Sequence, residues 1–168
     1  VVRCLGEPIS FGDFARPGTF GSKLYYKWFG GSHLVTRAGI ARTFQNIRLF
    51  PEMTVLENLL VAQHMYANRN PLAGLLKTKR YQQRETSLVE RAYHWLDTVG
   101  LSAFGNKMAA ELPYGHQRRL EIARAMCTNP KLICLDEPAA GLNPSETDEL
   151  ALLIKRLNTE FKVSVFVI

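Results

Sequence analysis

Long apolar runs, paired cysteines and internal repeats are all missing from this 168-residue sequence. No apolar stretch reaches the roughly 20 residues of a membrane-spanning helix, and no secretory signal is visible, so we expect neither kind of segment here. The three cysteines, Cys4, Cys127 and Cys134, lack the spacing of a metal or redox motif. The length is that of one domain and suffices to bury a real core.

A basic stripe is also missing, although the net charge is +6. Residues 1–48 hold seven Lys and Arg against two Asp and Glu, whereas residues 49–168 hold fourteen against thirteen. The excess therefore lies near the start of the chain, and no basic stripe interleaved with aromatic side chains crosses the rest. We predict no nucleic-acid partner.

A short apolar segment that ends in two acids is the most informative local pattern. Residues 131–135 follow a turn signal and read as a strand buried on both faces of a parallel sheet. Asp136 and Glu137 then lie at its carboxyl end, where open α/β sheets bind ligands. One acid there can hold Mg²⁺ and a second can polarise an attacking water. The alternative is a pair of solvated acids that merely ends the strand.

The segment after these acids predicts a βαβ unit. Asn143 suits a helix N-cap, Pro144 the first helical position and Glu146 the third. A helical apolar stripe follows, formed by Leu150, Leu153, Ile154 and Leu157. Residues 161–168 are β-branched and aromatic and are predicted to form the next strand, after a right-handed crossover.

Upstream, a glycine precedes a predicted helix. Gly115 comes before Leu120, Ile122, Ala123 and Met126, and free N–H groups at a helix start can bind anions. The alternative is an ordinary joint between loop and helix. Further upstream, residues 40–50 read as a strand and loop that contain Gln45.

Between that loop and Gly115 the pattern is helical. Thr54 and Glu57 form a capping box, so a helix begins there. A second apolar stripe, read as core, ends near Gly100 and consists of Leu88, Ala92, Trp95, Leu96 and Val99. A basic cluster precedes it, formed by Lys77, Lys79, Arg80 and Arg84. The cluster is a solvated face or a contact for lipid head groups or a membrane subunit.

Several strings together resemble ATP-binding cassette (ABC) ATPases. They are residues 113–121 and 132–144, with 42–50 and 57–64, and they are most like the ATP-binding subunits of bacterial branched-chain amino acid importers. The resemblance covers residues 35–168 and implies an α/β, partial P-loop NTPase fold with a parallel sheet core and a helical subdomain at about 51–115. Residues 1–34 do not resemble the family.

The resemblance also implies roles for individual residues. Asp136 and Gln45 would serve Mg²⁺, and Glu137 would act as the catalytic base or polarise the attacking water. Tyr114, Gly115 and Gln117 would bind the γ-phosphate of ATP held by the opposite subunit. Asn143 would also contact nucleotide. It lies in the family's D-loop, where it replaces the more usual aspartate. Pro113 stands where a serine is usual.

The implied function is to power import of branched-chain amino acids with ATP and Mg²⁺, at the cytoplasmic face of the inner membrane. Partners would be a second ATP-binding subunit in a homo- or heterodimer, two transmembrane permease subunits and, indirectly, a periplasmic binding protein. Three alternatives stay open: a non-catalytic fragment that keeps docking surfaces, an importer ATPase for urea or amides, and an ABC ATPase of DNA repair or translation. The absence of tandem cassettes and of a long coiled coil argues against the third.

One expected motif is missing from the 168 residues. No Gly-x-x-x-x-Gly-Lys-Ser/Thr loop occurs, and the nearest string, residues 18–24, has the wrong spacing. The family's switch histidine normally lies just beyond the last strand. We therefore expect an incomplete and inactive copy. Residues 1–34 could be a diverged replacement, a frameshifted gene end or a disordered extension; their seven aromatic residues argue against disorder, and we favour a corrupted start.

Overall fold

The computed structural model describes residues 3–4, 7–8, 36, 38–64, 66 and 79–168. Two short strands, β1 (Arg3–Cys4) and β2 (Glu7–Pro8), pair antiparallel near the N-terminus. The other predictions for residues 1–34, and those for Lys77 and the side chain of Arg80 in the basic cluster, lie outside the described residues. Within these ranges, none of the helices combines the length and apolarity that a membrane crossing requires.

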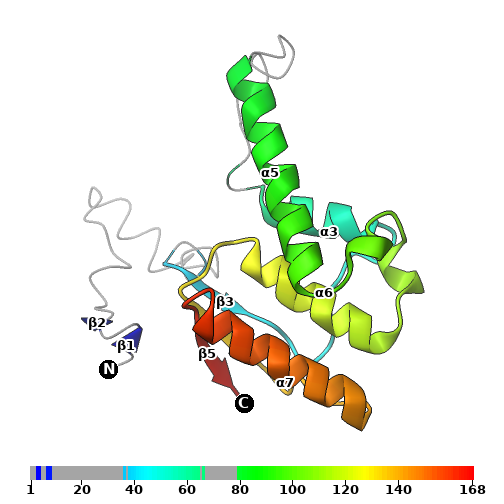
Figure 1. Cartoon of the computed structure of the whole chain (residues 1–168), viewed down its shortest axis with the longest axis vertical. Helices are drawn as coiled ribbons and strands as arrows, with labels where there is room; N and C mark the ends of the chain where they lie inside the picture. Colours follow the sequence, from blue (N-terminus) through cyan, green and yellow to red (C-terminus); the bar gives the residue numbers. More distant parts are fainter. Residues whose placement is uncertain (1–2, 5–6, 9–35, 37, 65, 67–78) are drawn as a thin grey trace, which may run out of the picture.

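A parallel sheet of three strands forms the base of the molecule (Figure 1). Its order is β3 (Ile40–Arg42), β4 (Leu132–Leu135) and β5 (Ser164–Val167), so β4 lies in the middle. Ile133 of β4 pairs with Ala41 on one side and Val165 on the other. The parallel arrangement predicted from the apolar run is therefore confirmed.

Strand β4 is more deeply buried on one face than on the other. Ile133 and Leu135 are completely buried, whereas Leu132 and Cys134 are half-buried. Successive side chains point to opposite faces of a sheet, and only the face of Ile133 and Leu135 belongs to the described hydrophobic core. The prediction of burial on both faces was therefore only half right.

The helix between β4 and β5 follows its sequence signals. Helix α7 (Pro144–Thr159) begins with the predicted N-cap. The Asn143 side chain accepts the N–H of Glu146 and the Glu146 side chain accepts the N–H of Asn143, which completes a capping box. Its buried stripe is Leu150, Leu153 and Leu157. Strand β5 starts three residues later than predicted, because Lys162 adopts a left-handed conformation with φ 56°.

Helices fill the chain between β3 and the next strand. They are α3 (Val55–Ala62), α5 (Lys79–Thr98), the 3₁₀ turns η2 (Ser102–Phe104) and η3 (Ala109–Glu111), and α6 (Tyr114–Met126). Thr54 and Glu57 cap α3 as predicted. Helix α5 extends away from the sheet, with its C-terminal half packed against α3 and α6 (Figure 1).

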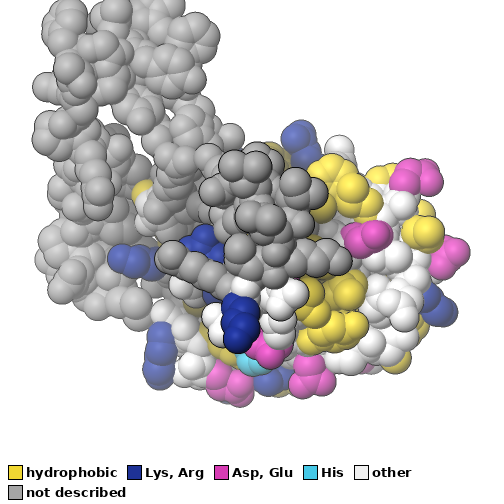
Figure 2. All heavy atoms as spheres, turned by 90° about the horizontal axis from the view of Figure 1, so that it is seen from above, with side chains coloured by type: hydrophobic (Ala, Val, Ile, Leu, Met, Phe, Trp, Pro, Cys, Tyr) yellow, Lys and Arg dark blue, Asp and Glu magenta, His cyan; other side chains and the backbone are white. Residues whose placement is uncertain are grey.

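Helix α6 connects these helices to the sheet. It contacts α3, α5 and β3, and it is buried around most of its circumference. The largest buried apolar side chains near it include Leu59, Leu96 and Leu120, each completely buried. A space-filling view from above shows hydrophobic side chains in groups separated by acidic and basic ones (Figure 2). Helix α6 thereby also contacts the loop that follows β3, where Arg118 donates to the carbonyls of Phe44 and Gln45.

Candidate functional site

The loops after β3 and β4 meet at the carboxyl end of the sheet. The Arg42 guanidinium donates to a carboxylate oxygen of Asp136 at 2.9 Å. The Thr43 N–H donates to the Cys134 carbonyl at 2.9 Å, and the Asp136 N–H donates to Thr43 Oγ1 at 3.4 Å. Because the strands are parallel and adjacent, residues far apart in sequence come together at this edge.

Glu137 and Gln45 are in direct contact at the same edge. The Gln45 side-chain amide donates to Glu137 Oε2 at 2.9 Å, and both groups are exposed. Glu137 has φ 43°, a left-handed conformation that is uncommon for a residue with a side chain and that clusters at functional sites. Its N–H donates to the Ile168 carbonyl at 3.1 Å. Three of the predicted site residues, Gln45, Asp136 and Glu137, thus lie together.

The start of α6 differs from the sequence prediction. The helix begins at Tyr114 with Pro113 as N-cap, so Gly115 lies in the first turn and does not precede the helix. A Cβ atom on Gly115 would lie 2.5 Å from Oε1 of Glu146. The missing side chain thus makes room for an acid of α7. Gly141, with φ 79°, lies against the Tyr114 ring in the same way, with 3.2 Å from its ideal Cβ to the ring.

The other predicted nucleotide-binding side chains make local hydrogen bonds. The Gln117 amide donates to the Leu112 carbonyl at 2.8 Å, which steadies the turn before α6. The Asn143 side chain caps α7 by accepting the Glu146 N–H at 2.8 Å. Tyr114 keeps an exposed ring, while its hydroxyl accepts a hydrogen bond from Arg118 at 2.8 Å.

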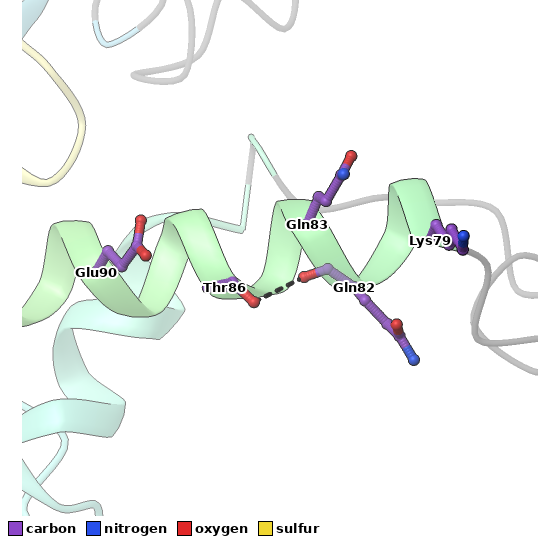
Figure 3. A pocket seen from close by; sticks show the side chains of 5 residues that line it. All are labelled: Lys79, Gln82, Gln83, Thr86 and Glu90. Carbon is purple, nitrogen blue, oxygen red and sulfur yellow. Dashed lines mark hydrogen bonds between the residues drawn. The ribbon is translucent and has the colours of Figure 1, made fainter.

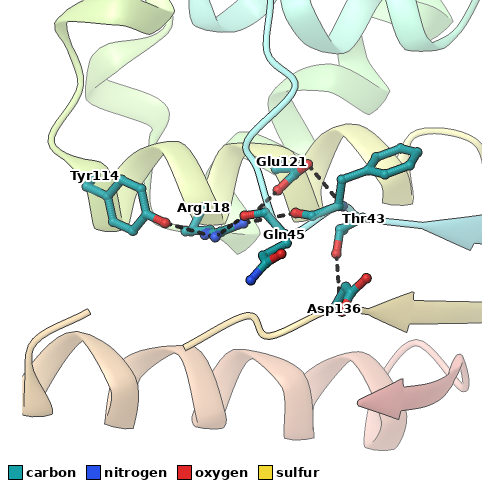
Figure 4. A network of polar contacts seen from close by, with 7 residues as sticks. Thr43, Gln45, Tyr114, Arg118, Glu121 and Asp136 are labelled. Atoms are coloured by element: carbon teal, nitrogen blue, oxygen red, sulfur yellow. Dashed lines mark hydrogen bonds and ion pairs between the residues drawn. The ribbon is translucent and has the colours of Figure 1, made fainter. Parts of the chain in front are cut away.

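Arg118 and Glu121 join α6 to the loop after β3 (Figure 4). Arg118 donates to the carbonyls of Phe44 and Gln45, and Glu121 accepts the Phe44 N–H at 3.5 Å. Both side chains are almost fully buried. Burial raises the pKa of the Glu121 carboxyl, against the opposing effects of the loop's N–H groups and of Arg118.

The oxygen donors at the sheet edge fit a magnesium ion that shares its coordination with phosphates and water. Asp136 offers a partly exposed carboxylate and Gln45 an amide oxygen. The part of the chain that the structure describes holds no cluster of three or more His, Cys, Asp or Glu that would cage a metal. Mg²⁺ commonly takes only one or two carboxylates plus substrate oxygens and water. The Arg42 guanidinium forms an ion pair with the carboxylate of Asp136.

Two cavities formed by described residues lie elsewhere. One, of about 390 Å³, is an open depression along α5, lined by Lys79, Gln82, Gln83, Thr86 and Glu90 (Figure 3). Another, of about 150 Å³, lies between β3 and α6 and includes Thr43, Glu121 and Arg124. Neither contains Gln45, Asp136 or Glu137, and the contact between Gln45 and Glu137 lies at an exposed edge.

Sequence reasoning missed Arg42, Arg118 and Glu121. Arg42 lies three residues before Gln45, and only the register of β3 against β4 places it beside Asp136. Arg118 and Glu121 look like ordinary surface charges, because their burial depends on a loop more than 70 residues away in the chain. A charged pair spaced i, i+3 beside an apolar helical stripe is the only signal they give.

Comparisons with known proteins point one way. The sequence model of the family described as "ABC transporter" matches residues 23–140, so the match begins within the segment 1–34 that the sequence strings had left out. The branched-chain amino acid transport ATP-binding protein BraF of Pseudomonas aeruginosa is 56% identical over 136 residues, which are 81% of this chain and 53% of BraF. LivG of Escherichia coli is 49% identical over 134 residues, 80% of this chain and 52% of LivG. The chain therefore spans about half the length of these relatives.

Solved structures agree in fold. The ADP conformation of the ATP-binding cassette MJ1267 matches 79% of this chain and 51% of its own, with a TM-score of 0.60 and 36% identity. The dimeric post-hydrolysis state of the cassette MJ0796, bound to ADP and Pi, matches 82% of this chain and 55% of its own, with a TM-score of 0.62 and 28% identity. The α/β fold with a parallel sheet core and a helical subdomain is confirmed.

Proposed function

Because this chain belongs to the ABC transporter family of ATP-binding cassettes, we propose that it forms part of an ATP-binding, ATP-hydrolysing subunit that powers import of branched-chain amino acids. The contact between Gln45 and Glu137, 2.9 Å long and next to Asp136, carries the proposal. It brings an amide and two acids together at the carboxyl ends of parallel strands, where α/β folds bind ligands. The cargo rests on the likeness to BraF and LivG.

Each residue at this edge has a distinct part in the proposed chemistry. Bound Mg²⁺ would supply charge neutralisation at the phosphates of ATP. Asp136 and the Gln45 amide oxygen would hold the ion, and the Glu137 carboxylate would polarise the attacking water or accept its proton. The amide N–H of Gln45 orients Glu137 by donating to its carboxylate. The exposure of this edge leaves room for both nucleotide and water.

The proposed complete site needs a second subunit. Tyr114, Gly115 and Gln117 would contact ATP on a partner ATP-binding subunit, with Asn143 beside them. The exposed Tyr114 ring and the N-terminal N–H groups of α6 support this part of the proposal, although Glu146 is close to Gly115. The partners would include two permease subunits on the cytoplasmic side of the inner membrane, with residues 35–168 as the cassette part and about 51–115 as the helical subdomain.

Nucleotide binding by the purified chain tests the proposal. A fluorescent ATP analogue should bind in the presence of Mg²⁺ and be displaced by ATP. Asp136→Asn should weaken the Mg²⁺-dependent part about tenfold or more, if the lost contact is worth as much as a hydrogen bond to a charged group, roughly 1.5–3 kcal/mol. No binding at millimolar nucleotide would refute the ATP-site proposal and favour a fragment that keeps only docking surfaces.

The role of Glu137 calls for a separate measurement. In a longer version of the chain that carries a phosphate loop, Glu137→Gln should keep nucleotide affinity within about twofold, because an amide oxygen still accepts from Gln45, while phosphate release falls to background. Exposed Glu52→Gln is the matched control and should change neither. Phosphate release that survives Glu137→Gln would remove this residue from catalysis.

Uptake of labelled leucine against labelled urea, in cells that carry the chain, separates the two candidate cargoes.

A further inference from the structure

Helix α6 buries a charged pair one turn apart. The side chains of Arg118 and Glu121 are both 4% exposed, and the contact between Arg118 Nη1 and Glu121 Oε2 is 3.4 Å long. That distance is long for a charged hydrogen bond. A buried pair of this kind gains little stability from its own attraction, because both charges lose their hydration. The reason for burying it must lie in what else the two side chains touch.

Both side chains are directed at the backbone of the loop after β3. Arg118 Nη1 donates to the Phe44 carbonyl at 3.1 Å, and Nη2 donates to the Gln45 carbonyl. Glu121 Oε1 accepts the Phe44 N–H at 3.5 Å, and the backbone N–H of Arg48 also favours its charged form. The N–H and the C=O of Phe44 are thus both held by α6. The guanidinium is oriented by loop carbonyls, and its buried Nε finds no partner among the described residues.

The same arginine touches two residues assigned to the ATP site. It holds the backbone of Gln45, whose side chain contacts Glu137 at 2.9 Å. It also donates to the Tyr114 hydroxyl at 2.8 Å, and its guanidinium carbon lies 5.3 Å from the centre of the Tyr114 ring. The Arg118 side chain therefore joins the start of α6 to the loop after β3 that contains Gln45 (Figure 4).

We propose that Arg118, supported by Glu121, is a positioning residue: it fixes the backbone at 44–48 so that the Gln45 amide reaches Glu137, and it fixes the Tyr114 ring at the start of α6. The functional meaning rests on the proposed ATP site. The geometry does not, because it consists of contacts among the side chains and backbone of the chain itself. The arrangement makes the position of Gln45 depend on α6, so a shift of the helix moves the glutamine with it.

Hydrogen–deuterium exchange of the chain without nucleotide tests this inference. In Arg118→Gln, exchange of the peptide that covers 43–50 should rise about tenfold or more, as expected for loss of hydrogen bonds to a charged group. Peptides from β4 and α7 should exchange as in the wild type. Arg119→Gln is the matched control, since this neighbour on α6 pairs with Glu149 at 3.2 Å and does not hold the loop. It should leave 43–50 unchanged.

The outcomes separate a local role from a general one. Arg118→Lys keeps the charge but loses the fork of donors, so it should also raise exchange at 43–50, by less than the glutamine variant. Unchanged exchange at 43–50 in a folded Arg118→Gln protein would overturn the proposal. So would an equal rise in every peptide, or failure of both variants to fold under conditions where Arg119→Gln folds. A chain that binds no nucleotide but shows the local rise would refute the ATP site and leave the positioning role intact.

Discussion

At the scale of single residues, Arg42 forms an ion pair with Asp136, the acid that would hold Mg²⁺ at the proposed site. The Arg42 side chain is 59% exposed, and its Nη2 lies 2.9 Å from Oδ2 of Asp136, whose side chain is 24% exposed. Exposed ion pairs of this kind are worth about 0–1 kcal/mol, so Arg42 holds Asp136 only weakly. A divalent cation would compete with it for the same oxygen.

Removal of the arginine should therefore strengthen metal binding. We expect Arg42→Gln to lower the Mg²⁺ concentration for half-maximal nucleotide binding about two- to fivefold, the factor that corresponds to an exposed ion pair. Titration of Mg²⁺ at fixed fluorescent nucleotide measures it. Arg156→Gln, which removes a similar exposed pair with Glu160 on α7, is the control and should have no effect. A higher Mg²⁺ requirement in Arg42→Gln would mean that the arginine holds phosphate and does not compete with the metal.

The contact between α6 and α7 depends on a glycine, and it sets the position of the first turn of α6. Gly115 is buried, and its ideal Cβ would lie 2.5 Å from Oε1 and 2.8 Å from Cδ of Glu146. The same carboxylate caps α7 by accepting the Asn143 N–H at 3.0 Å. A side chain at position 115 would therefore push Glu146 out of its capping position.

The sign of a Gly115→Ala substitution should depend on Glu146. In the wild type it should lower the free energy of unfolding by about 1–3 kcal/mol, because it overpacks the contact. In a Glu146→Ala background it should be neutral or stabilising by up to about 1 kcal/mol, because alanine favours the helix. Urea unfolding of the four proteins gives the coupling energy.

Gly105→Ala is the matched control for that cycle. Its ideal Cβ would meet the nearest side chain at 3.7 Å, an ordinary contact, and its φ of −49° suits alanine. It should show the same small effect with and without Glu146. If Gly115→Ala lowers the free energy of unfolding equally with and without Glu146, the glycine is not needed to make room for Glu146.

At the scale of elements, local signals were sufficient for the starts of α3 and α7. The capping box at Thr54 and the N-cap at Asn143 were predicted and are present, because a cap involves residues only three positions apart. The C-terminal end of α5 near Gly100 was predicted as well, and this glycine has φ 71°. The start of α6 was placed too late. Its N-cap is Pro113, whose side chain makes no capping hydrogen bond, so the usual sequence signal of a helix start is absent there.

At the scale of the whole molecule, Glu121 makes the docking of α6 on the sheet loop sensitive to pH. Burial raises its pKa above 4.5, while Arg118, Arg124 and the N–H groups of Phe44 and Arg48 act in the opposite direction. The folded chain thus binds this proton more tightly than the unfolded chain does. The stability that this proton contributes is complete below about pH 4.5 and is lost as the pH rises through the folded-state pKa.

A comparison with Glu121→Gln isolates that effect. The free energy of unfolding of the wild type, minus that of the variant, should be level below pH 4.5 and fall as the pH rises above it. Titrating groups that the substitution leaves in the same surroundings should cancel in this difference, including His116, whose pKa burial lowers. Urea unfolding from pH 4 to 8 measures the curve. A difference that rises with pH would show that Arg118 and the loop N–H groups outweigh the cost of burial.

The sequence by itself determined the class of fold and most of its helices and strands, and it predicted Asp136 and Glu137 as the acids of the proposed site. Residues 131–137 could be interpreted without the structure, because an apolar run indicates a buried strand and two adjacent acids indicate a charged end. The place of Gln45 beside these acids was implied by resemblance, since a lone glutamine has no local signature.

Only the tertiary structure decided which partners those residues have. The ion pair of Arg42 with Asp136 joins residues 94 positions apart, and the hydrogen bonds of Arg118 to the loop span 73 and 74 positions. Such contacts follow from strand register and from the docking of α6 over the sheet, which depend on the core as a whole. Local sequence patterns report the conformation of a segment and its apolar face, whereas a buried charge acquires its role from the distant backbone that it meets.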